Sequence, residues 1–443
     1  MNRRVAATLG VSVLVVAGGW LGARRLGAFE PSAMRAGAAR GSSMAELAQR
    51  DRQIRVWTAA LQQDPQSAIA LTQLSGLYLQ RARETGDDNN YVQAEQYSRR
   101  SLALRVNRNG PAFVTLAAAL VAQHRFHEAE QVARDLVEFD PDVPQYRAQL
   151  GEIQMELGDY AAARQSFDSL YKVRTHLSIA ARLARWAEVN GNTAYARKLL
   201  SDALAEAHTR RNLPKEQLAW FYLRLGDIDM RNGRLRSARA MFQKGLEIEP
   251  GDYRLLDEMA HLEAIAGNPK KTIEYGERAA ATKFDPGLLG TLGEAYATLG
   301  DDVHAEDYFM RMETAARAAP GGHDRGASMF LLDRNRRTPE VLANAQKEVE
   351  TRKDIYGYDL LAWALHKSGR NAEARAAMNE ARRLGTRDPV LLYHAGMIER
   401  ALGDARRARY FLGEALKVNP SFDPTQARDA RAVLDSLDQE LGR

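Results

Sequence analysis

Cysteine is absent from this chain of 443 residues. Its absence excludes disulfides, thiolate-bound zinc, iron–sulfur clusters, cysteine nucleophiles and a lipid-modified N-terminal cysteine. Proline is scarce, at 14 residues, and most prolines fall between stretches with helical patterning. From Met44 onward the strict alternation of apolar and polar residues that marks strands is also missing, so we expect an all-α fold.

A strong net charge is missing from the body of the chain, although the pI of about 9.2 first suggests a nucleic-acid binder. Residues 1–55 carry nine basic and three acidic side chains, whereas the remaining residues carry 53 basic and 54 acidic ones. The positive excess therefore lies at the N-terminus, where a basic cluster attracts anionic lipid headgroups. We expect no nucleic-acid partner, because a body with a net charge of −1 does not condense on phosphate.

An uncharged, mostly apolar run extends from Val5 to Ala23, between Arg3-Arg4 and Arg24-Arg25. Nineteen helical residues span ~28 Å, about the thickness of a hydrocarbon core. An uncleaved anchor, a cleaved signal peptide and a buried helix are all compatible with the run. The arginines directly after it disfavour cleavage there and favour the anchor. We expect a single-pass protein of the bacterial inner membrane with an extracytoplasmic body, or a secreted protein if the segment is cleaved.

The rest of the chain repeats with a period of about 34 residues. The small residues within the expected first helices are Ala117, Gly151, Ala184, Gly226, Ala260, Gly293, Ala362 and Gly396. Successive gaps are 34, 33, 42, 34, 33, 69 and 34, so one gap contains an insertion and another hides a degenerate unit at 324–353. Twelve positions after each of these residues lie Ala129, Ala163, Ala196, Ala238, Thr272, Ala305, Ala374 and Ala408.

Close packing of antiparallel helices explains this pattern, because small side chains let two backbones approach. We expect the small residue of each first helix to face the alanine of the second. A large residue four positions later would then fill the space between units, as with Phe167, Phe242 and Phe309. Prolines such as Pro250 end the second helices, and glycines such as Gly300 end the first ones in a left-handed conformation.

This pattern resembles the tetratricopeptide repeat (TPR), a helix–turn–helix unit with a period of 34. The stretches Tyr358–Trp363 and Leu391–Gly396 look like a bacterial TPR family. The resemblance covers roughly residues 68–420 and implies a right-handed superhelical solenoid of about ten units behind an N-terminal transmembrane helix. The expected divisions are a signal anchor at 1–25, a flexible linker at 26–43, the solenoid at 44–423 and a capping helix at 424–443.

No arrangement of residues in the sequence indicates catalysis, a metal site or a cofactor. The segment Gly267–Thr272 has the wrong spacing for a phosphate-binding loop and follows no strand. His124 and His127 straddle an expected turn, which disfavours a shared metal. The run Asp87–Asn90 lacks the ordered spacing and closing glutamate of a calcium loop. We therefore expect a protein that is not an enzyme.

The TPR resemblance implies a concave groove lined by the first helix of each unit, where an extended peptide or a partner helix would bind. The candidate groove residues are Trp220, Leu223, Asp227, Asp257, His261, Glu294, Asp359, Trp363, Tyr393 and Met397. Packing between repeats is the alternative explanation for Trp220, Trp363 and Tyr393. The expected function is a membrane-tethered scaffold that binds a protein or peptide. Alternatives are an assembly factor for an envelope complex or exported enzyme and, more remotely, an RNA-binding repeat or an enzyme.

Overall fold

The computed structural model describes residues 32–318 and 324–442, and this part of the chain is helical throughout, without strands. The proposed transmembrane helix at 5–23 lies outside the described residues. Within those residues, none of the helices combines the length and apolar character required to cross a bilayer. The helix α1 (Ser32–Gln63) begins well before Met44, so part of the segment expected to be a flexible linker is helical instead.

The first half of the solenoid consists of helix pairs in which each helix packs on the next one along the chain. The pairs are α2 (Ala68–Thr85) with α3 (Asn89–Leu104), α4 (Gly110–Ala122) with α5 (Phe126–Phe139), α6 (Pro144–Leu157) with α7 (Tyr160–Asp168) and the short η1 (Ser169–Val173), α8 (Leu177–Val189) with α9 (Thr193–Thr209), and α10 (Lys215–Arg231) with α11 (Leu235–Ile248).

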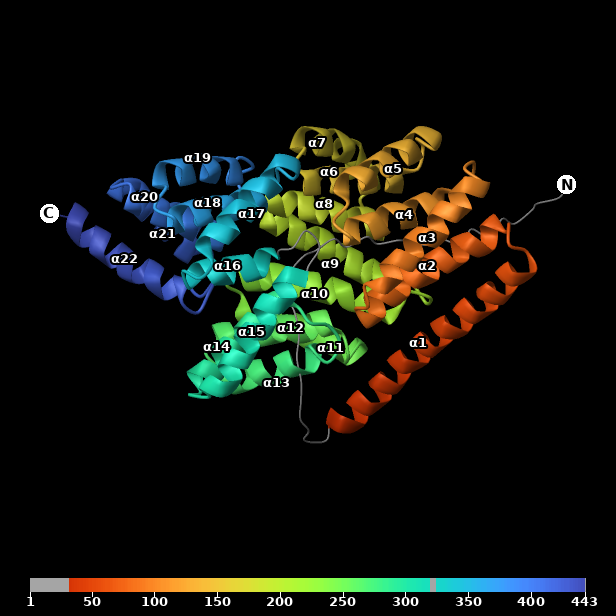
Figure 1. Cartoon of the computed structure of the whole chain (residues 1–443), viewed down its shortest axis with the longest axis horizontal. Helices are drawn as coiled ribbons and strands as arrows, with labels where there is room; N and C mark the ends of the chain where they lie inside the picture. The colour runs from red at the N-terminus through yellow and green to blue at the C-terminus, as the bar shows by residue number, and fades with distance from the viewer. Residues whose placement is uncertain (1–31, 319–323, 443) are drawn as a thin grey trace.

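The second half continues in the same way. Its pairs are α12 (Tyr253–Ile265) with α13 (Pro269–Ala279), α14 (Pro286–Thr298) with α15 (Asp302–Ala318), α16 (Arg325–Asp333) with α17 (Thr338–Thr351), α18 (Ile355–Lys367) with α19 (Asn371–Ala381), and α20 (Pro389–Ala401) with α21 (Ala405–Val418). The pair α16/α17 is the degenerate unit, and α22 (Gln426–Leu441) packs on α20 and α21. Helices α1 and α22 lie at opposite ends of the molecule (Figure 1).

Small residues set the packing within each unit, as the period predicted. Seven of the eight residues at the second-helix position are fully buried and Ala305 is 4% exposed. The facing partner differs from the expectation, however. A side chain placed on Gly151, Gly226, Gly293 or Gly396 would come nearest to the large residue sixteen positions later, such as Phe242 or Leu412. The large side chain lies on the glycine because nothing projects from that backbone.

The expected helix ends are confirmed. Helices α5, α11 and α21 each end two residues before a proline, at Phe139, Ile248 and Val418. Glycines between first and second helices adopt the left-handed conformation, with φ of 76° at Gly300 and 78° at Gly403. These local signals explain why helix boundaries could be read from the sequence.

First helices of most neighbouring units contact one another, as α6 contacts α8, and we call the row of first helices the inner layer. In Figure 1, α8 and α10 lie centrally, with α7, α19 and α13 toward the periphery. Because each unit turns slightly relative to the last, the chain winds into a superhelix.

The superhelix closes on itself within the length of this chain. A side chain placed on Gly86, Gly158, Gly191 or Gly233 would meet residues 167 to 197 positions later, as Gly158 meets Lys353. The corresponding glycines Gly300, Gly369 and Gly403 have nothing within 4 Å. We call this contact between successive superhelical turns the seam, and define it by Gly86, Gly158, Gly191 and Gly233 and the later residues that they meet.

Candidate functional site

A series of polar contacts joins the first helices of neighbouring units along the inner layer. Each contact pairs a side chain of one first helix with a side chain of the next first helix, at distances of 2.7 to 2.9 Å. The pairs are Glu152–Arg182, Glu188–Arg224, Glu216–Arg254, Asp333–Trp363 and Asp359–His394. These contacts fix the rotation of each unit relative to the next, because both partners project from rigid helices.

The sequence analysis did not identify most of these side chains. A usable signal was present, since an acidic residue in one first helix is followed by a cationic residue 30 to 38 positions later. Spacing close to the repeat period places the two side chains on the same face of adjacent first helices. Acidic and cationic residues at this spacing are common in the sequence, however. Only the structure shows which of them form ion pairs.

Three of the four C-terminal groove candidates, Asp359, Trp363 and Tyr393, lie together in one cluster. Asp359 Oδ1 is 2.9 Å from His394 Nδ1, and the Trp363 ring stacks on the His394 ring with 4.2 Å between centroids. Trp363 Nε1 donates a hydrogen bond of 2.9 Å to Asp333 Oδ1. Burial lowers the pKa of His394, but Asp359 outweighs this and raises it overall. The cluster joins α16, α18 and α20.

A second group of candidates surrounds Asp227 on α10. Asp227 forms ion pairs with Arg224 and Arg231, the latter at 2.7 Å. Burial by itself raises the pKa of Asp227, but the two arginines outweigh burial and hold the pKa below its usual range. His261 on α12 is half-buried near this group, and burial lowers its pKa.

The remaining candidates contribute mostly to the core. Trp220 and Leu223 belong to the apolar cluster of α6–α12, and Met397 packs against the C-terminal apolar cluster. Glu294 forms an ion pair with Arg334. Seven of the ten candidates are at most 8% exposed, which leaves only His261, Glu294 and Met397 partly accessible. The three aromatic candidates thus pack between helices, and their binding of a peptide stays a prediction.

Asp257, another candidate, is a buried acid without a counter-charge. It is 1% exposed, and neither carboxylate oxygen has a hydrogen-bond partner. Burial raises the pKa of Asp257 well above its usual range, and the neighbouring Glu258 and Asp285 raise it further. The pKa of Glu258 is itself raised to about 8, mainly by burial. These acids are therefore protonated in the folded protein under conditions in which an unfolded chain ionises them.

We expect the free energy of unfolding to fall as the pH rises from 6 to 9. Acids with raised pKa values contribute full stability below their unfolded pKa of about 4 and lose it as pH passes their folded pKa. Asp257→Asn cannot ionise, so the variant should be more stable than the wild type by about 1–3 kcal/mol at pH 9 and similar to it at pH 4. Urea unfolding followed by circular dichroism measures both values, with the exposed Asp202→Asn as the control. Parallel pH profiles for wild type and Asp257→Asn would contradict this assignment.

Other sequence candidates for chemistry occupy structural positions. Pro269 opens α13, and the hydroxyl of Thr272 donates to the carbonyl of Asn268. Asp87 accepts a hydrogen bond of 3.0 Å from the amide of Asn89 at the start of α3. Among the described residues, no three acidic or histidine side chains are grouped so that they could hold a metal ion.

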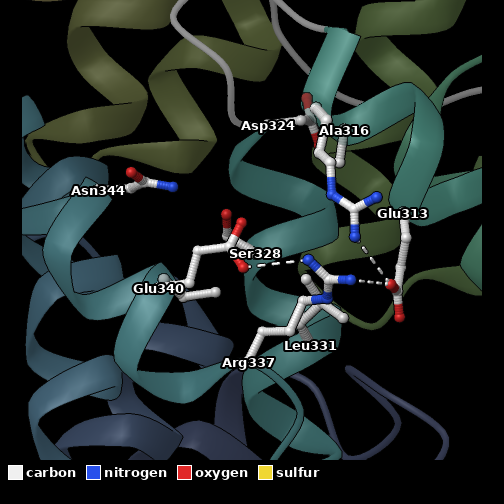
Figure 2. A pocket seen from close by; sticks show the side chains of 10 residues that line it. Glu313, Ala316, Asp324, Ser328, Leu331, Arg337, Glu340 and Asn344 are labelled. Atoms are coloured by element: carbon white, nitrogen blue, oxygen red, sulfur yellow. Dashed lines mark hydrogen bonds and ion pairs between the residues drawn. The ribbon is translucent and has the colours of Figure 1, made fainter.

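Two hollows lie outside the predicted groove. Figure 2 shows a polar one between α15, α16 and α17, where Glu313 pairs with Arg337 at 2.8 Å and Arg337 pairs with Glu340 at 3.1 Å. Its volume of about 20 Å³ suits a single water molecule. The other is an open apolar hollow of about 340 Å³ beside α15, with Phe284 and Met310 exposed at its rim.

Comparison with known proteins identifies the repeat. Residues 144–174 and 221–252 match the sequence profile of the tetratricopeptide repeat, and these segments correspond to α6–η1 and to most of α10 with α11. None of the curated proteins matches the chain in sequence.

Solved structures share the helical-repeat architecture at low identity. A human IFIT1 dimer with PPP-AAAA is 15% identical, with a TM-score of 0.46 over 78% of this chain and 87% of that one. A tetratricopeptide repeat protein from Parabacteroides merdae is 17% identical, with a TM-score of 0.34 over 59% of this chain and 98% of that one. The Cut9–Hcn1 hetero-tetramer of the APC/C is 12% identical, with a TM-score of 0.34 over 92% of this chain and 97% of that one. Likenesses at this level carry no inference about function. The chain therefore contains tetratricopeptide repeats within an all-helical solenoid.

Proposed function

We propose that this protein is a membrane-tethered scaffold that holds a segment of another protein against the inner layer of its superhelix and performs no catalysis. The series of polar contacts along the first helices carries the proposal. It fixes the inner layer in one geometry, and a preorganised surface loses little entropy on binding a partner. The partly exposed candidates His261, Glu294 and Met397 supply contacts of mixed character on that layer.

The charges of the inner layer support a protein partner over a nucleic acid. The arginines of this layer are already paired with carboxylates, as Arg182 is with Glu152 and Arg254 with Glu216. Phosphate binding depends on cations that exchange mobile counterions for the nucleic acid. Guanidinium groups with fixed carboxylate partners contribute little to such binding.

The tether rests on the sequence of residues 5–23 and their flanking arginines. Anchoring restricts a scaffold to the membrane plane and raises its effective concentration beside other membrane proteins. We place the protein in the bacterial inner membrane with its repeats on the extracytoplasmic side. An assembly factor for an envelope complex or an exported enzyme is a narrower form of the same proposal.

Affinity purification of the full-length protein from cross-linked membranes tests the binding function. We expect one partner to be recovered repeatedly, and the variant His261→Ala/Met397→Ala to lower its recovery at least about tenfold, because both changes remove partly exposed side chains from the inner layer. Tyr410→Ala is the matched control, since Tyr410 is 60% exposed on the second helix α21. Equal recovery with both variants would reject the inner layer as the binding surface. Recovery that survives removal of residues 1–25 would reject the tether.

A further inference from the structure

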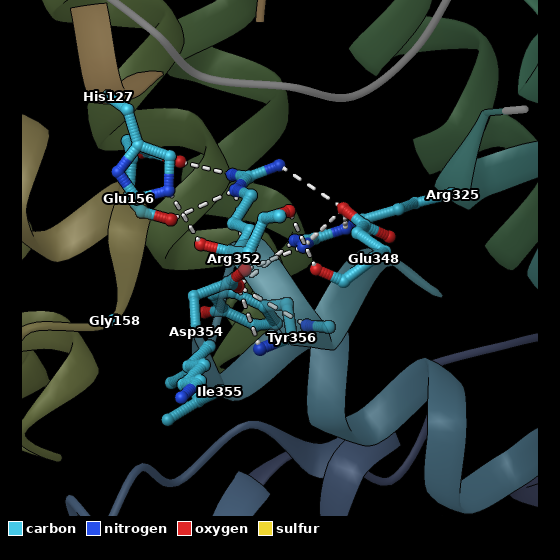
Figure 3. A network of polar contacts seen from close by, with 12 residues as sticks. His127, Glu156, Gly158, Arg325, Glu348, Arg352, Asp354, Ile355 and Tyr356 are labelled. Atoms are coloured by element: carbon cyan, nitrogen blue, oxygen red, sulfur yellow. Dashed lines mark hydrogen bonds and ion pairs between the residues drawn. The ribbon is translucent and has the colours of Figure 1, made fainter. Parts of the chain in front are cut away.

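The segment Arg352–Tyr356 crosses the seam and lies against the end of α6 (Figure 3). Three hydrogen bonds to the earlier superhelical turn hold its backbone and first side chain. The amide of Lys353 donates to the carbonyl of Leu157 at 2.9 Å, and the amide of Ile355 donates to Tyr160 Oη at 2.8 Å. Arg352 Nε donates to the carbonyl of Glu156 at 2.9 Å. Backbone hydrogen bonds of this kind are how proteins hold extended peptides.

Two side chains give this contact its specificity. Ile355 is 1% exposed and, among the described residues, is the only buried apolar residue beyond α12 that belongs to the core cluster of α6–α12. The guanidinium of Arg352 forms an ion pair with the carboxylate of Glu156 and lies 4.4 Å above the ring of Phe126. An apolar anchor and a paired, stacked arginine three residues apart form a compact recognition element.

The segment is also held in shape from its own side. Asp354 forms an ion pair with Arg325 at 2.5 Å and accepts hydrogen bonds from the amides of Tyr356 and Gly357 at 3.0 and 3.2 Å. The receiving surface consists of Phe126, Glu156, Leu157 and Tyr160, whose positions depend on α5, α6 and α7 and not on the segment. Ligand and receptor are thus separate pieces of one chain.

The seam is weaker than the packing along the chain. Neighbouring units share continuous apolar clusters, whereas the two superhelical turns meet here through the residues between α17 and α18, hydrogen bonds, an ion pair, the buried Ile355 and the partly buried Tyr356. Contacts with little buried apolar surface open at a lower free-energy cost than packed helix pairs. The segment can therefore leave its receptor if the first turn of α18, which contains Ile355 and Tyr356, moves with it.

We infer that Arg352–Tyr356 is an internal ligand of a peptide-binding site formed by Phe126, Glu156, Leu157 and Tyr160. The same site accepts an extended segment of a partner protein with an arginine three residues before a branched aliphatic residue. This inference rests on the proposed scaffold function and specifies one of its contact sites. While the internal segment is bound, it competes with the partner and keeps the superhelix closed.

A peptide with the sequence of residues 350–358, ETRKDIYGY, is the direct probe. Labelled with a fluorophore, it is titrated into the full-length wild type and into Arg352→Ala/Ile355→Ala, in which the internal ligand is weakened and the receptor unchanged. We expect saturable binding to the variant, at least about tenfold tighter than to the wild type, because an occupied site lowers the apparent affinity by its unoccupied fraction. Fluorescence anisotropy measures both dissociation constants.

Two matched controls distinguish binding at this site from nonspecific peptide binding. The peptide ETAKDAYGY lacks the arginine and the isoleucine, and we expect its binding to be at least about tenfold weaker. Adding Glu156→Gln to the variant removes the carboxylate that pairs with arginine and should weaken binding of the parent peptide to a similar extent. If the double variant loses its helical circular dichroism, Arg352→Ala alone takes its place.

Equal affinity for wild type and variant, or no saturable binding to a folded variant, would overturn the inference. These outcomes are distinguishable from failure of the proposed function. A partner recovered through His261 and Met397 while the peptide fails to bind leaves the scaffold in place and removes only this site. Peptide binding without any recovered partner supports the site and counts against the scaffold.

Discussion

Gly226→Ala is expected to lower the free energy of unfolding by about 2–4 kcal/mol, although it adds a single methyl group. The added carbon would overlap the ring of Phe242, which packs directly on the backbone of α10. Both helices belong to the same apolar cluster, so neither can move without opening its other contacts. Overpacking a close-packed crossing typically costs 1–3 kcal/mol, and more where the ring cannot shift.

Urea unfolding of the full-length protein measures this effect, and Gly413→Ala is its control. Gly413 is also helical, but an added carbon there has nothing within 4 Å. Replacing this glycine should stabilise the protein by up to about 1 kcal/mol, because alanine loses less entropy in a helix. If both variants shift stability in the same direction, close backbone approach is not what holds the unit together.

Arg182→Met should be destabilising by about 3–5 kcal/mol. Arg182 is 3% exposed, and its Nε lies 2.8 Å from Glu152 Oε2, so the variant leaves a buried carboxylate without its partner. Burial already raises the pKa of Glu152, and Arg182 opposes that rise. Losing the arginine raises the pKa further, so the variant should be less impaired at pH 5, where Glu152 can take up a proton, than at pH 8.

A double-mutant cycle separates the pair from the individual residues. Arg182→Met/Glu152→Leu removes both charges and should recover most of the lost stability, because buried ion pairs often exchange for apolar residues at little net cost. The control Lys198→Met breaks an exposed pair with Asp202 and should change stability by about 0.5 kcal/mol or less. Hydrogen exchange in α6 and α8 reports the effect locally. A double variant as unstable as Arg182→Met would contradict the cycle.

The sequence was most informative where the structural rule is local. The period located the units, and the expected degenerate unit is the pair α16/α17. The left-handed glycines and the prolines after second helices were also predicted, since both effects act within a few residues of the chain.

The candidate site was predicted less completely. The position of a residue on a first helix places it on the inner layer, but it does not say how tightly the next unit covers it. The groove candidates Trp363 and Asp359 lie in one buried cluster, whereas their partners Asp333 and His394 were not among the candidates. A polar pair between helices depends on the angle between units, and no short-range pattern encodes that angle.

The sequence by itself determined that small residues recur every 34 positions and that the described chain is a row of packed helix pairs. Only the tertiary structure decided that the row closes on itself, because small rotations between units add up over many repeats. The hydrogen bond from the amide of Ile355 to Tyr160 Oη at the start of α7 joins residues 195 positions apart, and no sequence periodicity indicates that these two meet.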